Sequence, residues 1–249
     1  MINGGIAAFF VYLYFFMLRW YNIIKYLKGG CVMDRKEILA MVDHTILKQG
    51  TTLDDIKKLI DEGIEYGVAS VCIPPYYVKA ASEYAAGRIP ICTVIGFPNG
   101  YSVVAAKACE AIEAIESGAS EIDTVINVCM VKNGAYDELL TELKVLRRVC
   151  EGKILKVIIE TCLLTEEEKI EMCRVVSESG ADYIKTSTGF GGGGATVEDV
   201  ALMRKYCADH VKIKASGGIR SFEDAEKMIE AGASRLGTSS LVKICVEGK

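Results

Sequence analysis

The segment Asp182-Tyr-Ile-Lys185-Thr-Ser-Thr188-Gly-Phe-Gly-Gly-Gly-Gly194 combines a short strand, a polar turn and a glycine-rich loop. A helix is predicted to begin directly after it, with Thr196 as the capping residue and Asp199 three positions later. Lysine is uncommon in a buried strand, because an unpaired ammonium is costly to remove from water. Lys185 precedes hydroxyl groups and backbone N–H groups that can bind an anion. A lone lysine here would also fit a side chain that extends into solvent.

The same alternation of strand and helix recurs from Asp34 to the end of the chain. Gly67, Gly118, Gly180 and Gly232 each lie between a helix and the next strand, where capping glycines are expected. The pattern predicts an α/β fold, a (β/α)8 TIM barrel formed as one domain by residues 33–249. An open doubly wound sheet is the alternative, because alternation does not prove closure. The predicted strands are 42–46, 68–73, 89–97, 121–127, 154–161, 183–188, 211–215 and 235–238.

Residues 1–32 form a hydrophobic N-terminal extension that differs from the rest of the chain. Residues 6–18 are an unbroken apolar run, shorter than the roughly 20 residues that a membrane-spanning helix needs. A membrane anchor is one interpretation. The other is that the working protein begins at Met33, since Lys28-Gly29-Gly30 can be encoded by a purine-rich sequence resembling a ribosome-binding site. Membrane contact is expected only if the extension belongs to the working protein.

The composition excludes several classes of protein. A net charge of −4 without a run of basic residues argues against nucleic acid as a partner. The ten cysteines lie singly in apolar segments and form no C-x-x-C pair, which is typical of reduced thiols in a cytoplasmic protein. With two histidines and no cysteine cluster expected, we predict no catalytic metal and no cofactor.

Polar residues follow the predicted strands, and in a barrel these positions meet at one entrance. The loops 216–218 and 237–240 resemble the phosphate-binding loops that such barrels place after strands seven and eight. A phosphorylated small molecule is therefore the expected substrate. The predicted substrate-binding residues are Asp43, Thr45, Cys72, Lys156, Thr188, Gly189, Gly217, Gly218, Gly237, Ser239 and Ser240.

Two lysines on neighbouring predicted strands indicate the chemistry. At pH 7 only about four in ten thousand free lysines are neutral and nucleophilic. Burial of Lys185 beside the ammonium of Lys214 is expected to raise that fraction, so that Lys185 attacks a carbonyl and forms a Schiff base. Asp123 is the predicted proton-transfer group. The alternatives are that Lys214 is merely solvated and that Asp123 forms a structural ion pair with Lys156.

Several segments together resemble those of deoxyribose-phosphate aldolase, in the same order, from about Met33 onward. They are Asp43-His-Thr45, Ala69-Ser-Val-Cys72-Ile, Glu121-Ile-Asp123, Leu155-Lys156-Val-Ile-Ile-Glu160-Thr, Tyr183-Ile-Lys185-Thr-Ser-Thr188-Gly, Lys214-Ala-Ser-Gly217-Gly218-Ile-Arg220 and Leu236-Gly-Thr-Ser-Ser240.

The resemblance implies a class I aldolase that reversibly cleaves 2-deoxy-D-ribose 5-phosphate into D-glyceraldehyde 3-phosphate and acetaldehyde, in the catabolism of deoxyribose phosphate. It also implies that Lys185 forms the Schiff base, that Lys214 tunes it and that Asp123 belongs to the proton relay. The partners expected are the phosphorylated sugar and further copies of the chain in a homo-oligomer. Alternatives are another phosphosugar aldolase or isomerase on the same barrel, or a membrane-tethered sugar-phosphate-binding protein.

Overall fold

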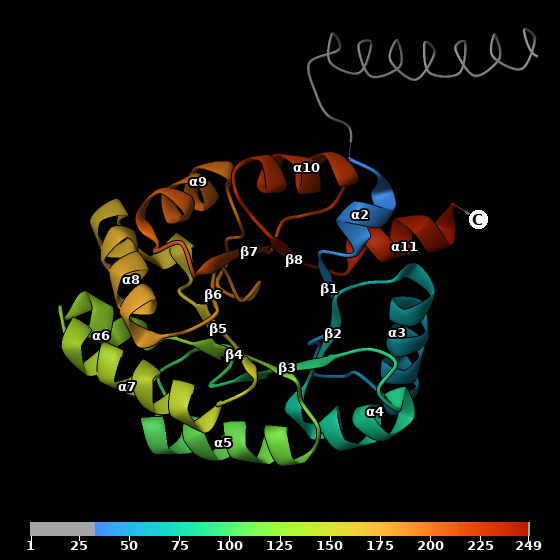
Figure 1. Cartoon of the computed structure of the whole chain (residues 1–249), viewed down its shortest axis with the longest axis horizontal. Coiled ribbons are helices and arrows are strands. Elements are labelled where there is room, and N and C mark those ends of the chain that lie inside the picture. The colour runs from blue at the N-terminus through green and yellow to red at the C-terminus, as the bar shows by residue number, and fades with distance from the viewer. Residues whose placement is uncertain (1–32, 249) are drawn as a thin grey trace, which may run out of the picture. The chain divides into compact units, whose positions relative to one another are not determined.

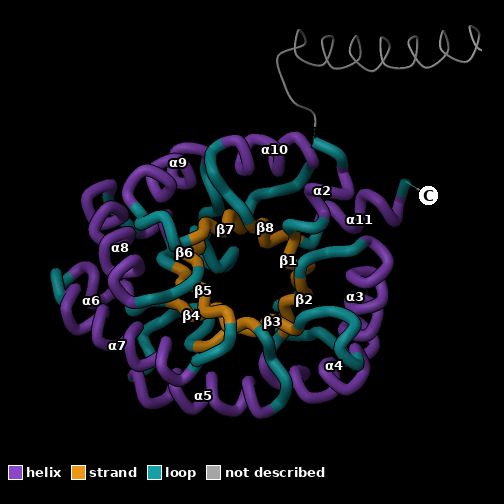
Figure 2. The backbone as a smooth tube through the Cα atoms, viewed as in Figure 1, coloured by secondary structure: helices purple, strands orange, loops and turns teal. Residues whose placement is uncertain are grey.

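The computed structural model describes residues 33–248, and eight parallel strands in them close into a barrel. The strands pair in sequence order and β8 returns to pair with β1, which confirms the (β/α)8 prediction over an open sheet. Figure 2 shows the strands as an inner ring surrounded by helices. The predictions for residues 1–32 lie outside the described residues. The strands are β1 Val42–Thr45, β2 Ser70–Ile73, β3 Ile91–Ile95, β4 Glu121–Val125, β5 Ile154–Ile158, β6 Tyr183–Lys185, β7 Lys212–Ser216 and β8 Arg235–Thr238.

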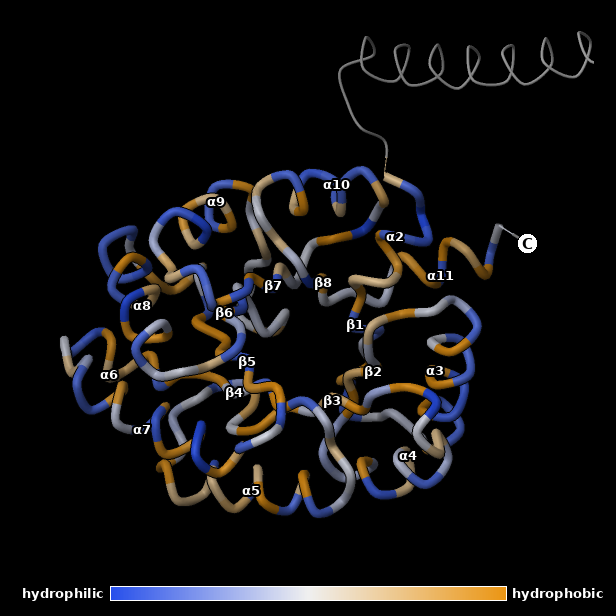
Figure 3. Tube along the Cα trace, viewed as in Figure 1, coloured by the Kyte–Doolittle hydropathy of each residue, from blue (hydrophilic) through white to orange (hydrophobic). Residues whose placement is uncertain are grey.

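The helices form the outer ring, and apolar and polar residues alternate along them (Figures 1 and 3). This alternation lets each helix cover the barrel with one face and meet solvent with the other. Among the described residues, no helix is both long enough and apolar enough to cross a membrane. The helices are α2 Arg35–Leu39, α3 Leu53–Tyr66, α4 Val78–Ala85, α5 Val104–Glu116, α6 Val128–Lys132, α7 Tyr136–Val149, α8 Glu166–Ser179, α9 Val197–Tyr206, α10 Phe222–Glu230 and α11 Ser240–Glu247, with 3-10 turns at Pro75–Tyr77 and Thr161–Leu163.

Local signals in the sequence set the ends of several helices. The Thr52 hydroxyl accepts a hydrogen bond from the Asp55 N–H, and the Asp55 carboxylate accepts one from the Thr52 N–H, which forms the capping box of α3. Gly67 ends α3 with a φ of 65°, a left-handed conformation that glycine adopts without strain. These caps fix where each helix turns back toward the barrel.

Most strands are shorter than the sequence predicts. The strand predicted over 183–188 is β6 Tyr183–Lys185, and the one predicted over 89–97 is β3 Ile91–Ile95. The apolar Phe97 past the end of β3 is partly buried, because it packs against Cys72, Cys92 and Val94. Strand assignment ends earlier, where the chain leaves the regular hydrogen-bonded ladder.

The barrel interior consists of layers of side chains drawn alternately from even and odd strands, as the twofold period of a strand requires. Branched apolar residues usually fill such layers. Here the layers are largely charged and polar, which indicates a functional interior. From the amino ends of the strands upward they contain Ser70, Glu121, Tyr183 and Arg235, then Asp43, Cys92, Lys156 and Lys214, then Cys72, Asp123, Lys185 and Gly237.

Candidate active site

Lys185 lies at the carboxyl end of β6 and pairs in register with Lys214 on β7. On the two preceding strands, Asp123 of β4 pairs in register with Lys156 of β5. The three residues predicted to perform the chemistry meet in the interior, because the Asp123 carboxylate reaches both lysines. Lys185 is 4% exposed, and Asp123 and Lys214 are fully buried.

The Asp123 carboxylate joins the two lysines through a single oxygen atom. Its Oδ2 accepts hydrogen bonds from Lys185 Nζ at 2.8 Å and from Lys214 Nζ at 2.7 Å. Its Oδ1 accepts from Lys156 Nζ at 2.8 Å, and the Cys92 Sγ lies 3.3 Å away. The ion pair between Asp123 and Lys156 that the sequence analysis treated as an alternative is therefore present together with the contact to Lys185.

Asp43 binds the opposite side of Lys214 and holds that lysine in place. Asp43 Oδ2 lies 2.5 Å from Lys214 Nζ, and Asp43 Oδ1 accepts hydrogen bonds from Arg235 Nη1 and Ser70 Oγ, each at 2.7 Å. Lys214 is thus bound by two buried carboxylates. Lys212, the other lysine of β7, is exposed at the amino end of the strand.

Glu121 and Arg235 lie in the lowest layer, and neither was predicted to be a site residue. Glu121 Oε2 lies 2.5 Å from Lys156 Nζ, and Glu121 Oε1 lies 3.5 Å from Arg235 Nη2. Each is the first residue of its strand, and both are buried. In the sequence, each of the two could have been recognised as a charged residue at the first position of an otherwise buried strand.

The buried charges shift one another's proton affinity. Burial alone would raise the pKa of Asp123, but the ammonium groups of Lys156, Lys185 and Lys214 outweigh it and hold that pKa well below its usual range. Asp43 shows the same net lowering of its pKa, because Lys214, Lys156 and Arg235 outweigh burial. Burial lowers the pKa of Lys214, whereas Asp123 and Asp43 raise it more, so this lysine stays charged. Asp123 is therefore ionised and accepts hydrogen bonds from all three lysines.

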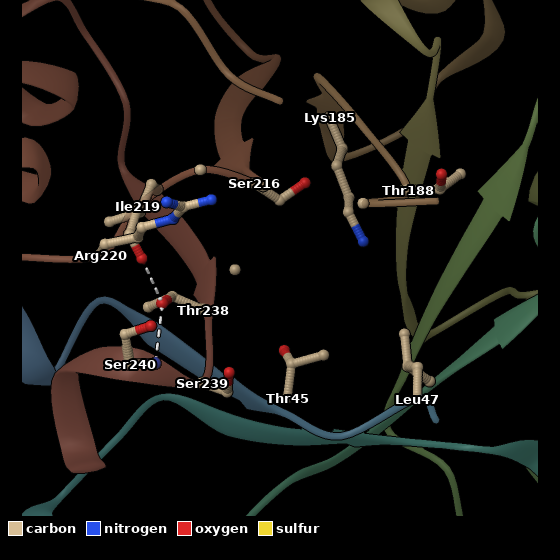
Figure 4. A pocket seen from close by; sticks show the side chains of 14 residues that line it. Thr45, Leu47, Lys185, Thr188, Ser216, Ile219, Arg220, Thr238, Ser239 and Ser240 are labelled. Carbon is tan, nitrogen blue, oxygen red and sulfur yellow. Dashed lines mark hydrogen bonds between the residues drawn. The ribbon is translucent and has the colours of Figure 1, made fainter. Parts of the chain in front are cut away.

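A pocket of about 240 Å³ opens above this cluster, and the Lys185 ammonium points into it (Figure 4). The two predicted glycine-rich loops line one side of the pocket, and Arg220 lies on the same side. Eight of the predicted substrate-binding residues line it, namely Thr45, Thr188, Gly189, Gly217, Gly218, Gly237, Ser239 and Ser240.

The glycines of these loops are needed for their backbone conformation and for space. Gly217 and Gly218 have φ values of 80° and 81°. A Cβ atom on Gly237 would lie 2.8 Å from Ser216 Cβ and 3.2 Å from Lys214 Cε. The Thr238 hydroxyl donates to the Ile219 carbonyl and accepts from the Ser240 N–H, which ties the two loops together at the start of α11. Backbone N–H groups at such a helix start bind anions well.

Three predicted substrate-binding residues do not line the pocket. Asp43, Cys72 and Lys156 are fully buried. Asp43 and Lys156 bind the other charged residues, as described above. Their link to a ligand in the pocket is indirect, through Asp123 and Lys214.

The structure brings two cysteines together that the sequence analysis expected to lie apart. Cys72 and Cys92 occupy paired positions on β2 and β3, and a hydrogen bond from Cys92 lowers the pKa of the Cys72 thiol. Their sulfur atoms and an Asp123 oxygen lie within 4.8 Å of one another, a spacing that fits metal ligands. Lysine ammonium groups already bind both Asp123 oxygens, so a cation there would have to displace them.

An apolar surface covers the side of the entrance opposite the two glycine-rich loops. Leu47 lines the pocket and packs with Phe97 against a buried cluster of Cys72, Cys92 and Val94. The Phe190 ring contacts Phe97 edge to face, with the ring centroids 5.3 Å apart. The pocket therefore has one side suited to an anion and one side suited to apolar atoms.

Glu160 fixes the wall of the pocket that carries Thr188. The Thr188 N–H and hydroxyl both donate to the Glu160 carboxylate, and the Thr188 hydroxyl accepts from the Phe190 N–H. Glu160 has a φ of 51°, which is uncommon for a residue other than glycine. Continued strand alternation from Lys156 would place Glu160 on the same face as that lysine. The structure instead directs its carboxylate to the loop after β6.

Comparison with known proteins places these features in a family context. Residues 37–247 match the family described as DeoC/LacD family aldolase. Over 209 residues the chain is 59% identical to deoxyribose-phosphate aldolase of Clostridioides difficile strain 630. The matched region covers 84% of this chain and 95% of that protein.

Solved structures of aldolases are similar over the same region. An aldolase named QR15 is 42% identical with a TM-score of 0.81, covering 85% of this chain and 95% of the other. The tetrameric deoxyribose phosphate aldolase of Aeropyrum pernix is 30% identical with a TM-score of 0.80, covering 86% and 92%.

Proposed function

Because the chain belongs to the DeoC/LacD family of aldolases, we propose that it reversibly cleaves 2-deoxy-D-ribose 5-phosphate into D-glyceraldehyde 3-phosphate and acetaldehyde through a Schiff base on Lys185. One observation carries the proposal. Lys185 is a nearly buried amine that points into a pocket, with Asp123 and Lys214 beneath it and two anion-binding loops beside it. Another phosphosugar enzyme on this barrel would share the loops without needing this arrangement of lysines.

The reaction begins at the amine of Lys185. Its lone pair attacks carbon 1 of the open-chain sugar, and loss of water gives a protonated imine. A base removes the proton of the 3-hydroxyl, the bond between carbons 2 and 3 breaks, and its electron pair moves toward the imine nitrogen. Glyceraldehyde 3-phosphate leaves, and an enamine of acetaldehyde remains on Lys185. Protonation of carbon 2 and addition of water then release acetaldehyde and regenerate the amine.

Asp123 is the proposed group for the proton transfers. It is ionised and bonded to Lys185 Nζ at 2.8 Å, so it can move a proton to or from the nitrogen or, through water, the reacting carbons. Lys214 shares the same oxygen and stays protonated. Its positive charge favours the neutral amine on Lys185, which is the nucleophile.

The two sides of the pocket fit the two ends of the substrate. The loops around Gly217, Gly218 and Ser240 can bind the 5-phosphate. The Leu47 and Phe97 side chains cannot form hydrogen bonds, which suits a carbon 2 without a hydroxyl group.

The direct test is chemical trapping combined with product analysis. The purified protein is incubated with deoxyribose 5-phosphate, both products are measured, and borohydride is added before mass mapping of the modified lysine. We expect both products, modification of Lys185 alone and full activity in the presence of a metal chelator. Ribose 5-phosphate is the matched control substrate. Absence of products, trapping on a different lysine, or activity that a chelator abolishes and zinc restores would each contradict the proposal.

We further propose that residues 33–249 form the aldolase domain, since the family match covers 37–247. The similar Aeropyrum pernix protein is a tetramer, and we propose that this chain also assembles with copies of itself. Light scattering on the purified protein measures that assembly. All nine cysteines in residues 33–248 are free thiols, and on this ground we propose the cytoplasm as its location.

A further inference from the structure

Arg235 and Glu121 lie in the lowest layer of the barrel, and neither lines the pocket. Arg235 Nη1 is bonded to Asp43 Oδ1 at 2.7 Å, and Glu121 Oε2 is paired with Lys156 Nζ at 2.5 Å. The mechanism proposed above uses neither residue. Buried charges are nevertheless expensive to maintain, so their presence here calls for an explanation.

Two chains of alternating charge run upward from these residues and converge on Asp123. In the first, Arg235 binds Asp43, whose other oxygen lies 2.5 Å from Lys214. In the second, Glu121 binds Lys156, which donates to Asp123 Oδ1 at 2.8 Å. Because Lys214 also donates to Asp123, both chains end one contact away from Lys185.

Lys185 is the basic group of this cluster that is held least strongly. Its contact with Asp123 Oδ2 is shared with Lys214, and it alone among the three lysines faces the pocket. Lys214 lies close to two carboxylates, and Lys156 lies close to those of Asp43, Glu121 and Asp123. If the cluster gives up one proton, Lys185 is therefore the residue that loses it.

Counting charges shows why a proton should be lost. Within the part of the chain that the structure describes, four basic side chains of the cluster (Lys156, Lys185, Lys214 and Arg235) meet three carboxylates (Asp43, Glu121 and Asp123). The cluster carries one excess positive charge when all are ionised, and it is neutral when Lys185 is an amine. An excess charge in a buried site is unfavourable.

We infer that Arg235 and Glu121 are positioning residues that set the protonation state of Lys185 through Asp43, Lys156 and Asp123. The positive charge of Arg235 favours the neutral, nucleophilic amine, and the negative charge of Glu121 favours the ammonium. The inference rests on the proposed function, since it concerns the same lysine. The other titratable or charged groups near this site are Cys72 of β2, Cys92 of β3, Tyr183 of β6, Glu160 after β5 and Arg220 at the pocket.

The test compares single and double charge-removing variants. Arg235→Gln, Glu121→Gln and the double variant are trapped with acetaldehyde and borohydride over a range of pH. Each trapping rate is divided by the rate measured for a small reference amine in the same buffer. This division corrects for the change of borohydride reactivity with pH. Relative to the wild type, Arg235→Gln should move the midpoint of trapping to higher pH, and Glu121→Gln should move it to lower pH. A charge about 10 Å away at an effective dielectric constant of about 20 predicts shifts of roughly one pH unit.

The double variant is the decisive measurement, because it removes one charge of each sign. Its midpoint should return to within a few tenths of a pH unit of the wild-type value. Lys212→Gln is the matched control, since it removes a positive charge from an exposed residue that also lies over the Tyr183 ring, and it should leave the midpoint unchanged. Thermal unfolding reports whether each variant is folded. If Arg235→Gln does not fold, Glu121→Gln and the double variant still decide the question.

The outcomes separate the inference from the function on which it rests. Shifts of the two single variants in the same direction, or no shift in either folded variant, would overturn the inference while leaving the aldolase intact. A wild-type protein that is not trapped on Lys185 would overturn the proposed function first. Opposite shifts of the trapping midpoint in the two single variants, with a wild-type midpoint in the double variant, would support both the inference and the proposed function.

Discussion

Replacement of Lys214 by methionine tests how the second lysine activates the first. The Nζ atoms of Lys185 and Lys214 lie 2.8 and 2.7 Å from the same Asp123 oxygen, so they are at most about 5.5 Å apart. Two positive charges about 5 Å apart at an effective dielectric constant of about 20 repel each other by about 3 kcal/mol. That energy corresponds to a factor on the order of 10² in a protonation equilibrium.

In Lys214→Met the repulsion is absent, and Lys185 should therefore keep its proton at neutral pH. We expect the rate of borohydride trapping with acetaldehyde to fall about 100-fold at pH 7 and to recover as the pH is raised by about two units. Methionine fills a similar volume. Asp43 keeps Arg235 and Ser70 as partners, so the loss of stability should be smaller than the roughly 3–5 kcal/mol of a fully broken buried pair.

The assay measures trapping rates of the wild type, Lys214→Met and Lys212→Met between neutral and alkaline pH, with thermal unfolding on the same samples. Lys212 is the matched control because it lies on the same strand but is exposed. A Lys214→Met rate equal to the wild-type rate at pH 7 would refute the electrostatic reasoning. A Lys214→Met trapping rate that is lower than the wild-type rate by the same factor at every pH at which the variant stays folded would also refute it.

Four further results are expected. Lys185→Met should abolish turnover and trapping, and label that appears on Lys156 instead would show that the nucleophile is misassigned. Asp123→Asn should lower kcat by about 10²–10⁴ with little change in KM, whereas normal turnover with a raised KM would mean that Asp123 only positions the ligand. Burial lowers the pKa of His44 from 6.5 more than Glu62 raises it, so Tm should fall as the pH drops below about 6.5 and fall less in His44→Gln. A chain that begins at Met33 should match the activity of the full chain, and an inactive shorter chain would show that residues 1–32 are needed.

Local patterns in the sequence determined the elements and the residues that perform the chemistry. The capping box at Thr52 and the glycine at position 67 mark helix ends through contacts within a few residues, so they can be read from the sequence alone. Lys185 and the loop around Gly217 stood out because their residue types are unusual or specific at the ends of strands. The alternation of eight units favoured the barrel, although only the pairing of β8 with β1 proved closure.

The tertiary structure alone decided which side chains share a layer. Asp43 and Arg235 are 192 positions apart and become partners because the barrel closes with a stagger between its strands. The same stagger places Asp43 and Lys156 in the layer below Lys185, although each lies on a strand whose end faces the pocket. A sequence shows which residues of one strand point inward, since that follows from a period of two. How far each strand is displaced against its neighbours depends on closure of the whole ring, and this displacement sets the contacts among the buried charges.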